Sequence, residues 1–370
     1  MVCYMDFFAP ALWEAISTCS KLRRIRLHKS IARGPDMDKI VDAIKLVRVF
    51  HITHADIDFS GVTSPLTSTS PPRLPNLQSL DIFRPENFSG NIGPLIQHAP
   101  RLVSLKMDPQ IETKPASHMR ELAVSLRGCR KLQDITLNNM VLSNEDSNMI
   151  FSAVTDTKRL SWKVGGFSWQ ALGSLISRHS RTITHLYLGD SSELTSSMTQ
   201  TIMANCPLLE YLRLNTISGT DLARIEKVDQ GNQSMGENTG QVILGEDWIC
   251  LGIKTLQLQF DLSSKTMDID RNTPEGEAMF QCQQQLEQYH VFRQIGRLTR
   301  LQDLFISKSR FNRENERSLD LRLEANGGSL EGLTALKELQ SIEFYDTNQE
   351  LGRDEIDWML SQLPCLKYLK

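Results

Sequence analysis

The sequence lacks the features that mark several classes of protein. No apolar run approaches the roughly 18 residues of a membrane-spanning helix, and the first 30 residues show no signal-peptide pattern. Gly and Pro, 21 and 14 of the 370 residues, are too few for collagen or for extensive disorder. The seven cysteines include no Cys-x-x-Cys pair, which favours free thiols in a reducing compartment. We therefore expect a protein of the cytoplasm, the nucleus or both.

Motifs for catalysis and for cofactor binding are also missing. The sequence contains no GxGxxG, no phosphate-binding P-loop and no GxSxG. His51 and His54 have the spacing of some metal ligands, but they lack the glutamate of a helical zinc motif. We interpret them as two surface histidines. We expect no enzyme activity, no cofactor and no metal site.

The net charge of −3 conceals an uneven distribution along the chain. Residues 1–185 contain 23 Lys and Arg against 16 Asp and Glu, a balance of +7. Residues 186–370 contain 18 against 28, a balance of −10. A basic half could contact nucleic acid or an acidic partner, and the simpler alternative is charge that drifts along an extended surface.

One apolar phrase recurs along the chain. It has the form Leu-x-x-Leu-x-Leu, in which Ile, Val, Met or Phe can replace a leucine, and a clear copy consists of Leu209, Leu212 and Leu214. A cysteine stands three residues ahead of four copies, at Cys19, Cys129, Cys206 and Cys250. We interpret it as a small apolar side chain at a tight corner between a helix and a strand. The copies begin at residues 22, 47, 77, 102, 132, about 160 (where the register is open), 183, 209, 253, 301, 339 and 366.

The spacing of these copies predicts the fold class. Most steps are 23 to 30 residues, enough for one strand, one helix and two short turns. The Leu-x-Leu alternation indicates a strand with inward leucines, and residues 36–45, 119–127, 169–178 and 195–205 have apolar residues at helical spacing. Because no single unit can bury its apolar face, the units must stack. We predict one α/β solenoid of about 12 units over residues 1–370, with a parallel sheet on the concave face and helices on the convex face.

These phrases resemble the leucine-rich-repeat family. The unit at residues 183–206 is similar to the cysteine-containing intracellular subtype, and the stretch NCPLLEYL at 205–212 is similar to the repeat region of fungal F-box proteins. The resemblance extends from about residue 12 and implies a horseshoe like that of ribonuclease inhibitor. The chain departs from the family where a polar residue should follow each strand, so we expect irregular convex turns. No F-box is visible ahead of the first strand phrase.

Two steps in the array are too long for one repeat. The steps from 209 to 253 and from 253 to 301 are 44 and 48 residues, which predicts insertions near 218–245 and 261–290. The first contains the polar stretch 229–240, and the second ends in an expected helix from Gly276 to Gly296. Residues 60–75 are a third candidate loop. Because the chain stops within a strand phrase, with no polar capping unit, we expect either that it is part of a longer protein, which we favour, or that another chain covers the ends of the array.

The candidate binding residues lie on the predicted concave face. The residues that flank and separate the last two apolar positions of each phrase point outward there. Tyr187, Tyr211 and Arg213 lie on adjacent predicted strands, and Tyr and Arg are enriched at binding hot spots. Taken singly, each position is better explained as an ordinary solvent-facing strand residue, whereas the cluster of Tyr187, Tyr211 and Arg213 is equally compatible with a binding role and with a plain surface. The predicted partner-binding residues are Arg24, Arg26, Phe83, Lys106, Tyr187, Tyr211, Arg213, Gln257, Phe305 and Tyr345.

We predict a protein-interaction module. The resemblance implies a more specific role, the substrate-recognition arm of an F-box-type ubiquitin ligase receptor, with a protein ligand on the concave face and the ligase adaptor bound through an F-box that this chain lacks. The alternatives are a general leucine-rich-repeat scaffold and a regulator of a small GTPase. A nucleic-acid-binding surface is less favoured because the basic half lacks interleaved stacking aromatics. We expect no membrane partner.

Overall fold

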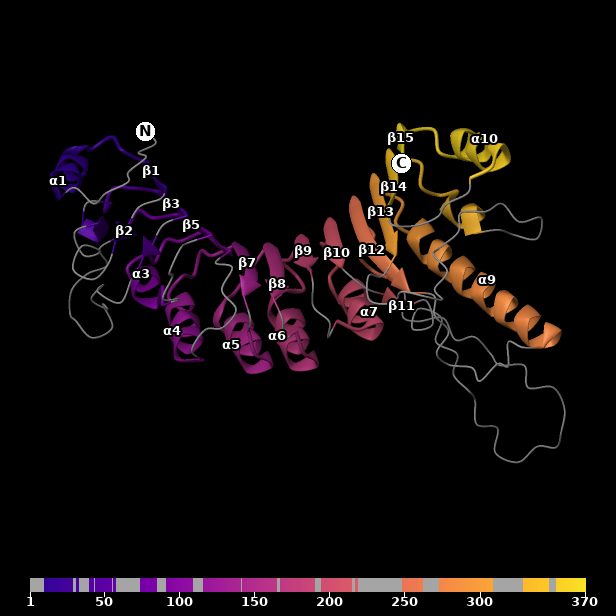
Figure 1. The fold of residues 1–370 in the computed structure, drawn as a ribbon, viewed down its shortest axis with the longest axis horizontal. Helices are drawn as coiled ribbons and strands as arrows, with labels where there is room; N and C mark the ends of the chain where they lie inside the picture. Colours follow the sequence, from indigo (N-terminus) through magenta and orange to yellow (C-terminus); the bar gives the residue numbers. More distant parts are fainter. Residues whose placement is uncertain are drawn as a thin grey trace, which may run out of the picture. The chain divides into compact units, whose positions relative to one another are not determined.

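The chain forms two compact units, Met1–Glu193 and Leu194–Lys370, each with parallel strands and a buried core (Figure 1). The prediction of one array over residues 1–370 stays a prediction. The computed structural model describes residues 10–28, 31–32, 40–42, 44–54, 56–57, 74–84, 91–108, 116–140, 142–164, 167–189, 194–214, 217–218, 248–261, 273–308, 329–345 and 351–370.

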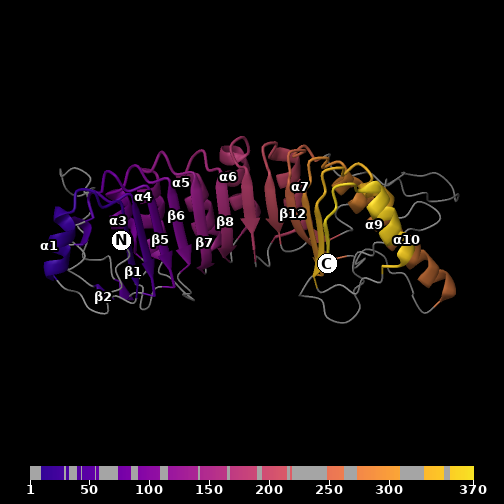
Figure 2. The same ribbon diagram turned by 90° about the horizontal axis from the view of Figure 1, so that it is seen from above.

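The first unit is built on a sheet of parallel strands, which lie side by side in Figure 2. Each strand pairs with the strand of the next repeat, in the order β1 (Arg24–His28), β3 (Val49–Thr53), β5 (Ser79–Phe83), β6 (Ser104–Asp108), β7 (Asp134–Met140), β8 (Arg159–Val164) and β9 (His185–Leu188). A separate short pair consists of β2 (Ile31–Ala32) and β4 (Asp56–Ile57). The predicted strand phrases of this unit are therefore confirmed.

The strand register places the repeated apolar residues opposite one another. Leu27 lies opposite Ile52, which lies opposite Ile82, and all three are at most 1% exposed. The phrase near residue 160 now has a definite register, because Leu160 lies opposite both Ile135 and Leu186. Burial of these alternating side chains is the main free-energy gain that holds the strands in this register.

Helices cover one face of this sheet. They are α3 (Gly93–Gln97), α4 (Ala116–Leu126), α5 (Asn144–Ala153) and α6 (Trp169–His179), which lie together below the strands in Figure 1, and α1 (Pro10–Thr18) precedes β1. The helices predicted at 119–127 and 169–178 are confirmed as α4 and α6. Of the helix predicted at 36–45, residues 40–42 are helical, residues 44 and 45 form a turn instead, and residues 36–39 and 43 lie outside the described residues. Ser143 and Asp146 form a capping box that begins α5.

The second unit repeats this arrangement. Its parallel strands are β10 (Tyr211–Leu214), β12 (Thr255–Asp261), β13 (Asp303–Lys308), β14 (Ser341–Tyr345) and β15 (Tyr368–Leu369), with β11 (Ile217–Ser218) beside β12. Its helices are α7 (Ser196–Asn205), α9 (Pro274–Gly296), the 3-10 helix η3 (Ser329–Leu333) and α10 (Arg353–Gln362). The helix predicted at 195–205 is confirmed as α7, with Thr195 as its N-cap.

The two predicted insertions are described only in part. Residues 219–247 and 262–272 lie outside the described residues, and so do the predicted loop at 229–240 and residues 60–73 of the predicted loop at 60–75. The helix expected from Gly276 to Gly296 is confirmed as α9, which begins two residues earlier at Pro274. Thr273 caps α9 through a hydrogen bond from the Gly276 backbone N–H at 3.0 Å. Among the described residues, no helix is long and apolar enough to cross a membrane.

A tight backbone turn precedes most of the strands. In this turn the N–H of the first apolar residue donates to the carbonyl three residues earlier, as from Leu132 to Cys129 at 3.0 Å and from Leu209 to Cys206 at 3.2 Å. Cys129, Cys206 and Cys250 occupy this position and are buried, which confirms the predicted role of a small apolar corner residue for these three cysteines. Cys19 forms the same turn but is exposed.

Candidate functional site

The side of each sheet that faces away from the helices carries the predicted binding residues. Here we call it the open face, and it consists of the side chains that alternate with the buried apolar residues of each strand. In β1, for example, Arg24 and Arg26 are exposed while Ile25 and Leu27 are buried. Parallel pairing then aligns equivalent residues in rows, and the middle row of the first unit runs Arg26, His51, Asp81, Lys106, Thr136, Ser161 and Tyr187.

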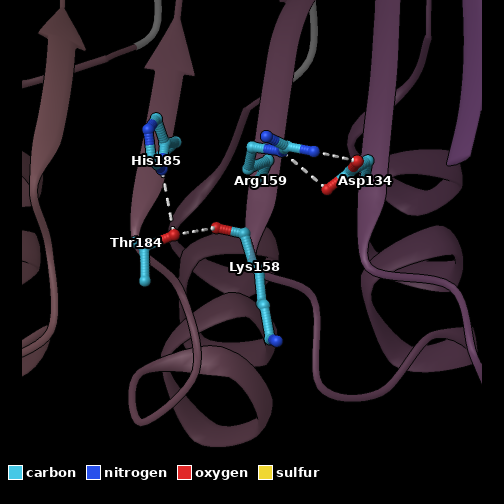
Figure 3. Close-up of polar contacts among 5 residues, drawn as sticks. All are labelled: Asp134, Lys158, Arg159, Thr184 and His185. Carbon is cyan, nitrogen blue, oxygen red and sulfur yellow. Dashed lines mark hydrogen bonds and ion pairs between the residues drawn. The ribbon is translucent and has the colours of Figure 1, made fainter. Parts of the chain in front are cut away.

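An ion pair joins two strands of the first unit. Arg159 on β8 donates to Asp134 on β7 through both Nε, at 2.8 Å, and Nη2 (Figure 3). This hydrogen bonding raises the pKa of Arg159. The guanidinium is well exposed, so solvent screens the pair and its contribution to stability is small. Sequence reasoning missed Arg159 because the register near residue 160 was open; the alternation of Leu160 and Trp162 was the available signal.

A second polar group lies beside this pair. Thr184 precedes β9, and its Oγ1 donates to the Lys158 carbonyl at 3.2 Å. The same Oγ1 lies 2.9 Å from Nδ1 of His185 (Figure 3). His185 is opposite Arg159 in the strand register. The row of Asp134, Arg159 and His185 therefore presents a carboxylate, a guanidinium and an imidazole on three neighbouring strands.

Aromatic and imidazole rings gather where β1, β3 and β5 end. The His28 and His54 rings lie 5.8 Å apart, and the His54 and Phe83 rings 6.3 Å apart, both edge to face. The Arg84 guanidinium lies 5.2 Å from the centroid of the Phe83 ring. Nδ1 of His51 lies 3.3 Å from Oδ2 of Asp81. His51 and His54 thus contact different partners, and no cluster of three metal-binding side chains occurs in the described part of the chain.

The first unit holds half of the predicted binding residues. Arg24, Arg26, Phe83 and Lys106 are exposed on the open face. Tyr187 is half-buried on β9, and its ring lies against Gly189: a Cβ at Gly189 would come within 2.6 Å of the Tyr187 ring. The ring thus covers the backbone just after β9, and a side chain at residue 189 would displace it.

The second unit holds the other half. Arg213, Gln257, Phe305 and Glu343 form one row on neighbouring strands, and Tyr211 lies two residues before Arg213 on β10. Tyr345 belongs to the next row, where its hydroxyl donates to Glu343, and this hydrogen bond raises the pKa of Tyr345. Because Tyr187 belongs to the first unit, its grouping with Tyr211 and Arg213 stays a prediction.

The buried cysteines are poor candidates for nucleophilic chemistry. Burial raises the pKa of the Cys129, Cys206 and Cys250 thiols to about 12. At neutral pH these residues are thiols, whereas the reactive nucleophile is the thiolate. The Sγ of Cys250 lies 3.4 Å from the Sδ of Met203, a contact inside the apolar core. These three residues serve packing.

Parallel strands spaced by one repeat, with helices on one face, define an α/β leucine-rich-repeat fold. No family model and no curated protein matches the sequence. Among solved structures, an internalin (InlF) from Listeria monocytogenes is similar at 10% identity over 95% of this chain and 81% of that chain, with a TM-score of 0.47.

Two further solved structures are similar over nearly all of this chain. The leucine-rich-repeat protein LIC12759 of Leptospira interrogans is 12% identical over 99% of this chain and 93% of that chain, with a TM-score of 0.37. TLR13, in a complex with ssRNA13, is 14% identical over 97% of this chain and 50% of that chain, with a TM-score of 0.42.

Proposed function

We propose that this chain is a protein-interaction module that binds its partner on the open face. The observation that carries the proposal is the row of Arg213, Gln257 and Phe305, which lie in register on three neighbouring strands. The row thus presents a guanidinium, an amide and an aromatic ring side by side. Aromatic and arginine side chains dominate the binding energy of many protein interfaces.

The backbone beneath this row supports the same function. Leu212, Leu256 and Leu304 lie opposite one another in the adjacent positions and are fully buried. Because the core fixes these strands, their backbone loses little conformational entropy when a partner binds to the outward side chains. Neighbouring side chains in a row stand about 4.8 Å apart, a spacing that lets a partner contact several of them at once.

The test uses a variant of the open face and a matched helix variant. Tyr211→Ala with Arg213→Ala removes one tyrosine and one arginine from β10. Tyr289→Ala with Arg293→Ala removes the same two residue types from exposed positions of α9. We expect quantitative affinity capture from cell extract to lose a defined set of proteins with the first variant and to retain it with the second. Equal capture by both variants would contradict the proposal.

We further propose the finer role that the resemblance to fungal F-box proteins implies, substrate recognition for a cullin-type ubiquitin ligase in the cytoplasm or nucleus. Support comes from the repeat phrase at residues 205–212 and not from a docking module within the chain. The test is co-purification of the ligase adaptor with the full-length product of the gene, expressed from its own locus. A full-length product that binds no adaptor would remove the ligase role and leave the interaction module intact.

A further inference from the structure

The first two strands of the first unit carry positive charge only. Residues 19–28 and 44–54, which include β1 and β3 with their preceding turns, contain no Asp or Glu. All six of their Lys and Arg side chains are exposed: Lys21, Arg23, Arg24, Arg26, Lys45 and Arg48. We call these six residues the basic strip. β1 and β3 are paired along their whole length, so Arg24 and Arg26 stand on a backbone that strand pairing fixes.

Two arginines of the basic strip point out of the open face. Arg24 and Arg26 flank the buried Ile25 on β1, so their side chains project on the same side, about 7 Å apart along the strand. Neither forms an ion pair with any residue that the structure describes. Arg23, by contrast, donates to the carbonyls of Ser20 at 2.7 Å and Leu22 at 3.1 Å, and thereby braces the turn before β1.

An exposed aromatic side chain lies two strands away from Arg26. Phe83, at the end of β5, is 38% exposed. Two residues that contact the Phe83 ring have an unusual backbone conformation: His54 and Arg84 both adopt positive φ, of 48° and 44°. Their N–H groups donate to the carbonyls of Phe83 at 3.1 Å and Asp108 at 2.8 Å. An arginine is uncommon in this conformation, and here the conformation brings its guanidinium over the Phe83 ring.

We infer that the basic strip, with Phe83 at its border, binds an extended acidic peptide segment of a partner protein, one that carries an aromatic residue among its carboxylates. In an extended peptide, alternate side chains share one face at about 7 Å, which matches the separation of Arg24 and Arg26. Arginine also pairs with carboxylates through two parallel hydrogen bonds. This inference rests on the proposed function and names the chemistry of the partner at one end of the open face.

The ring geometry favours a peptide over a single-stranded nucleic acid. Stacking of successive bases needs accessible aromatic faces along the strand. Here the His28, His54 and Phe83 rings meet edge to face, at interplanar angles of 81° and 82°, and the Arg84 guanidinium occupies one face of Phe83. Phe83 is still 38% exposed and can contact one apolar side chain, which suits a peptide with a single aromatic residue.

Fluorescence anisotropy with the full chain tests this inference. The probes are labelled peptides of sequence EDEFEDE and KRKFKRK and a labelled single-stranded RNA of twelve uridines, each at low and at moderate salt. The variant is Arg24→Glu with Arg26→Glu, with Arg24→Gln and Arg26→Gln as a milder pair. The control, Arg127→Glu with Arg130→Glu, makes the same charge change at exposed residues beside α4.

We expect the acidic peptide to bind, and binding to weaken about tenfold or more in both β1 variants and less than about twofold in the control. The basic peptide should not bind. Equal weakening by the control would show that net charge alone attracts the peptide, and RNA that binds more tightly than the peptide would replace it as the ligand; either overturns the inference. If the acidic peptide fails to bind while the Tyr211 and Arg213 variant still loses its captured proteins, only this inference fails.

Discussion

Replacing Gly296 by alanine should destabilise the second unit. Gly296 ends α9, and a Cβ added there would overlap with the carbonyl oxygen of Gly332 in η3. Gly332 is equally confined, because its own added Cβ would lie 2.8 Å from the carbonyl carbon of Phe292. Both separations are well inside the roughly 3.5–4.0 Å at which nonbonded heavy atoms attract. The two elements approach this closely only because both positions lack a side chain.

The expected cost follows from what would have to move. The obstacle is backbone, which cannot rotate away as a side chain could, so α9 and η3 must separate. Phe292 and Ile295 of α9 and Leu333 of η3 are fully buried, and separation of the two elements would open gaps in this close-packed region. Overpacking a close-packed core costs about 1–3 kcal/mol, and we expect Gly296→Ala to lie at the upper end, about 2–3 kcal/mol.

Gly173 provides a control of opposite sign. It lies within α6, it is exposed, and no atom lies within 4 Å of an added Cβ. Alanine is the better helix former by about 0.5–1 kcal/mol, so Gly173→Ala should stabilise the first unit. The same substitution therefore has opposite predicted effects at the two positions.

Hydrogen exchange measured by mass spectrometry reads the two units separately. In Gly296→Ala, amides of α9 and β13 that exchange through unfolding should exchange about 30- to 150-fold faster, which corresponds to about 2–3 kcal/mol. Peptides from β5 to β9 should be unchanged. Exchange within about twofold of the unmodified chain at α9 would refute the close approach of α9 and η3. Destabilisation by Gly173→Ala would instead contradict the open space found around that residue.

Two further predictions concern cysteine reactivity and pH. Alkylation of the native chain at neutral pH should modify the exposed Cys19, Cys282 and Cys365 and spare the buried Cys129, Cys206 and Cys250 until denaturant is added; rapid labelling of the second group would contradict their burial. Burial lowers the pKa of His179 from 6.5, so below pH 6.5 the unfolded chain binds a proton that the folded chain does not. The free energy of unfolding should therefore decrease as the pH is lowered below 6.5. The contribution of His179 to this decrease is at most about 1.4 kcal/mol per pH unit. His179→Gln should flatten that dependence in urea titrations at pH 7.5 and 5.5, and an unchanged slope would argue against it.

The repeat made much of the secondary structure predictable. The alternation at Leu212 and Leu214 has the period of a strand with one buried face, and α4, α6 and α7 follow from apolar residues at helical spacing. The phrase near residue 160 was ambiguous because Leu160, Trp162 and Val164 are all apolar at alternate positions. Strand pairing with β7 and β9 selected one register.

The candidate site was predicted as positions and not as contacts. The sequence pattern identified Arg24, Arg26 and Phe83 as outward residues, because a period of two assigns each strand residue to a face. The ring contacts of Phe83 with His54, and the ion pair of Arg159 with Asp134, were not predicted. Each joins residues about one repeat apart, and such contacts depend on how neighbouring strands align.

The sequence by itself determined the repeat, the fold class and the side of each strand that faces the core, because these depend on local periodicity and on the burial of leucines. Only the tertiary structure decided which outward side chains meet, since that depends on strand register and on backbone features such as the positive φ of His54 and Arg84. It also decided the contact of Gly296 with Gly332, 36 residues apart in the sequence. No local pattern specifies such an approach, because it arises from the packing of two elements that a long connection separates.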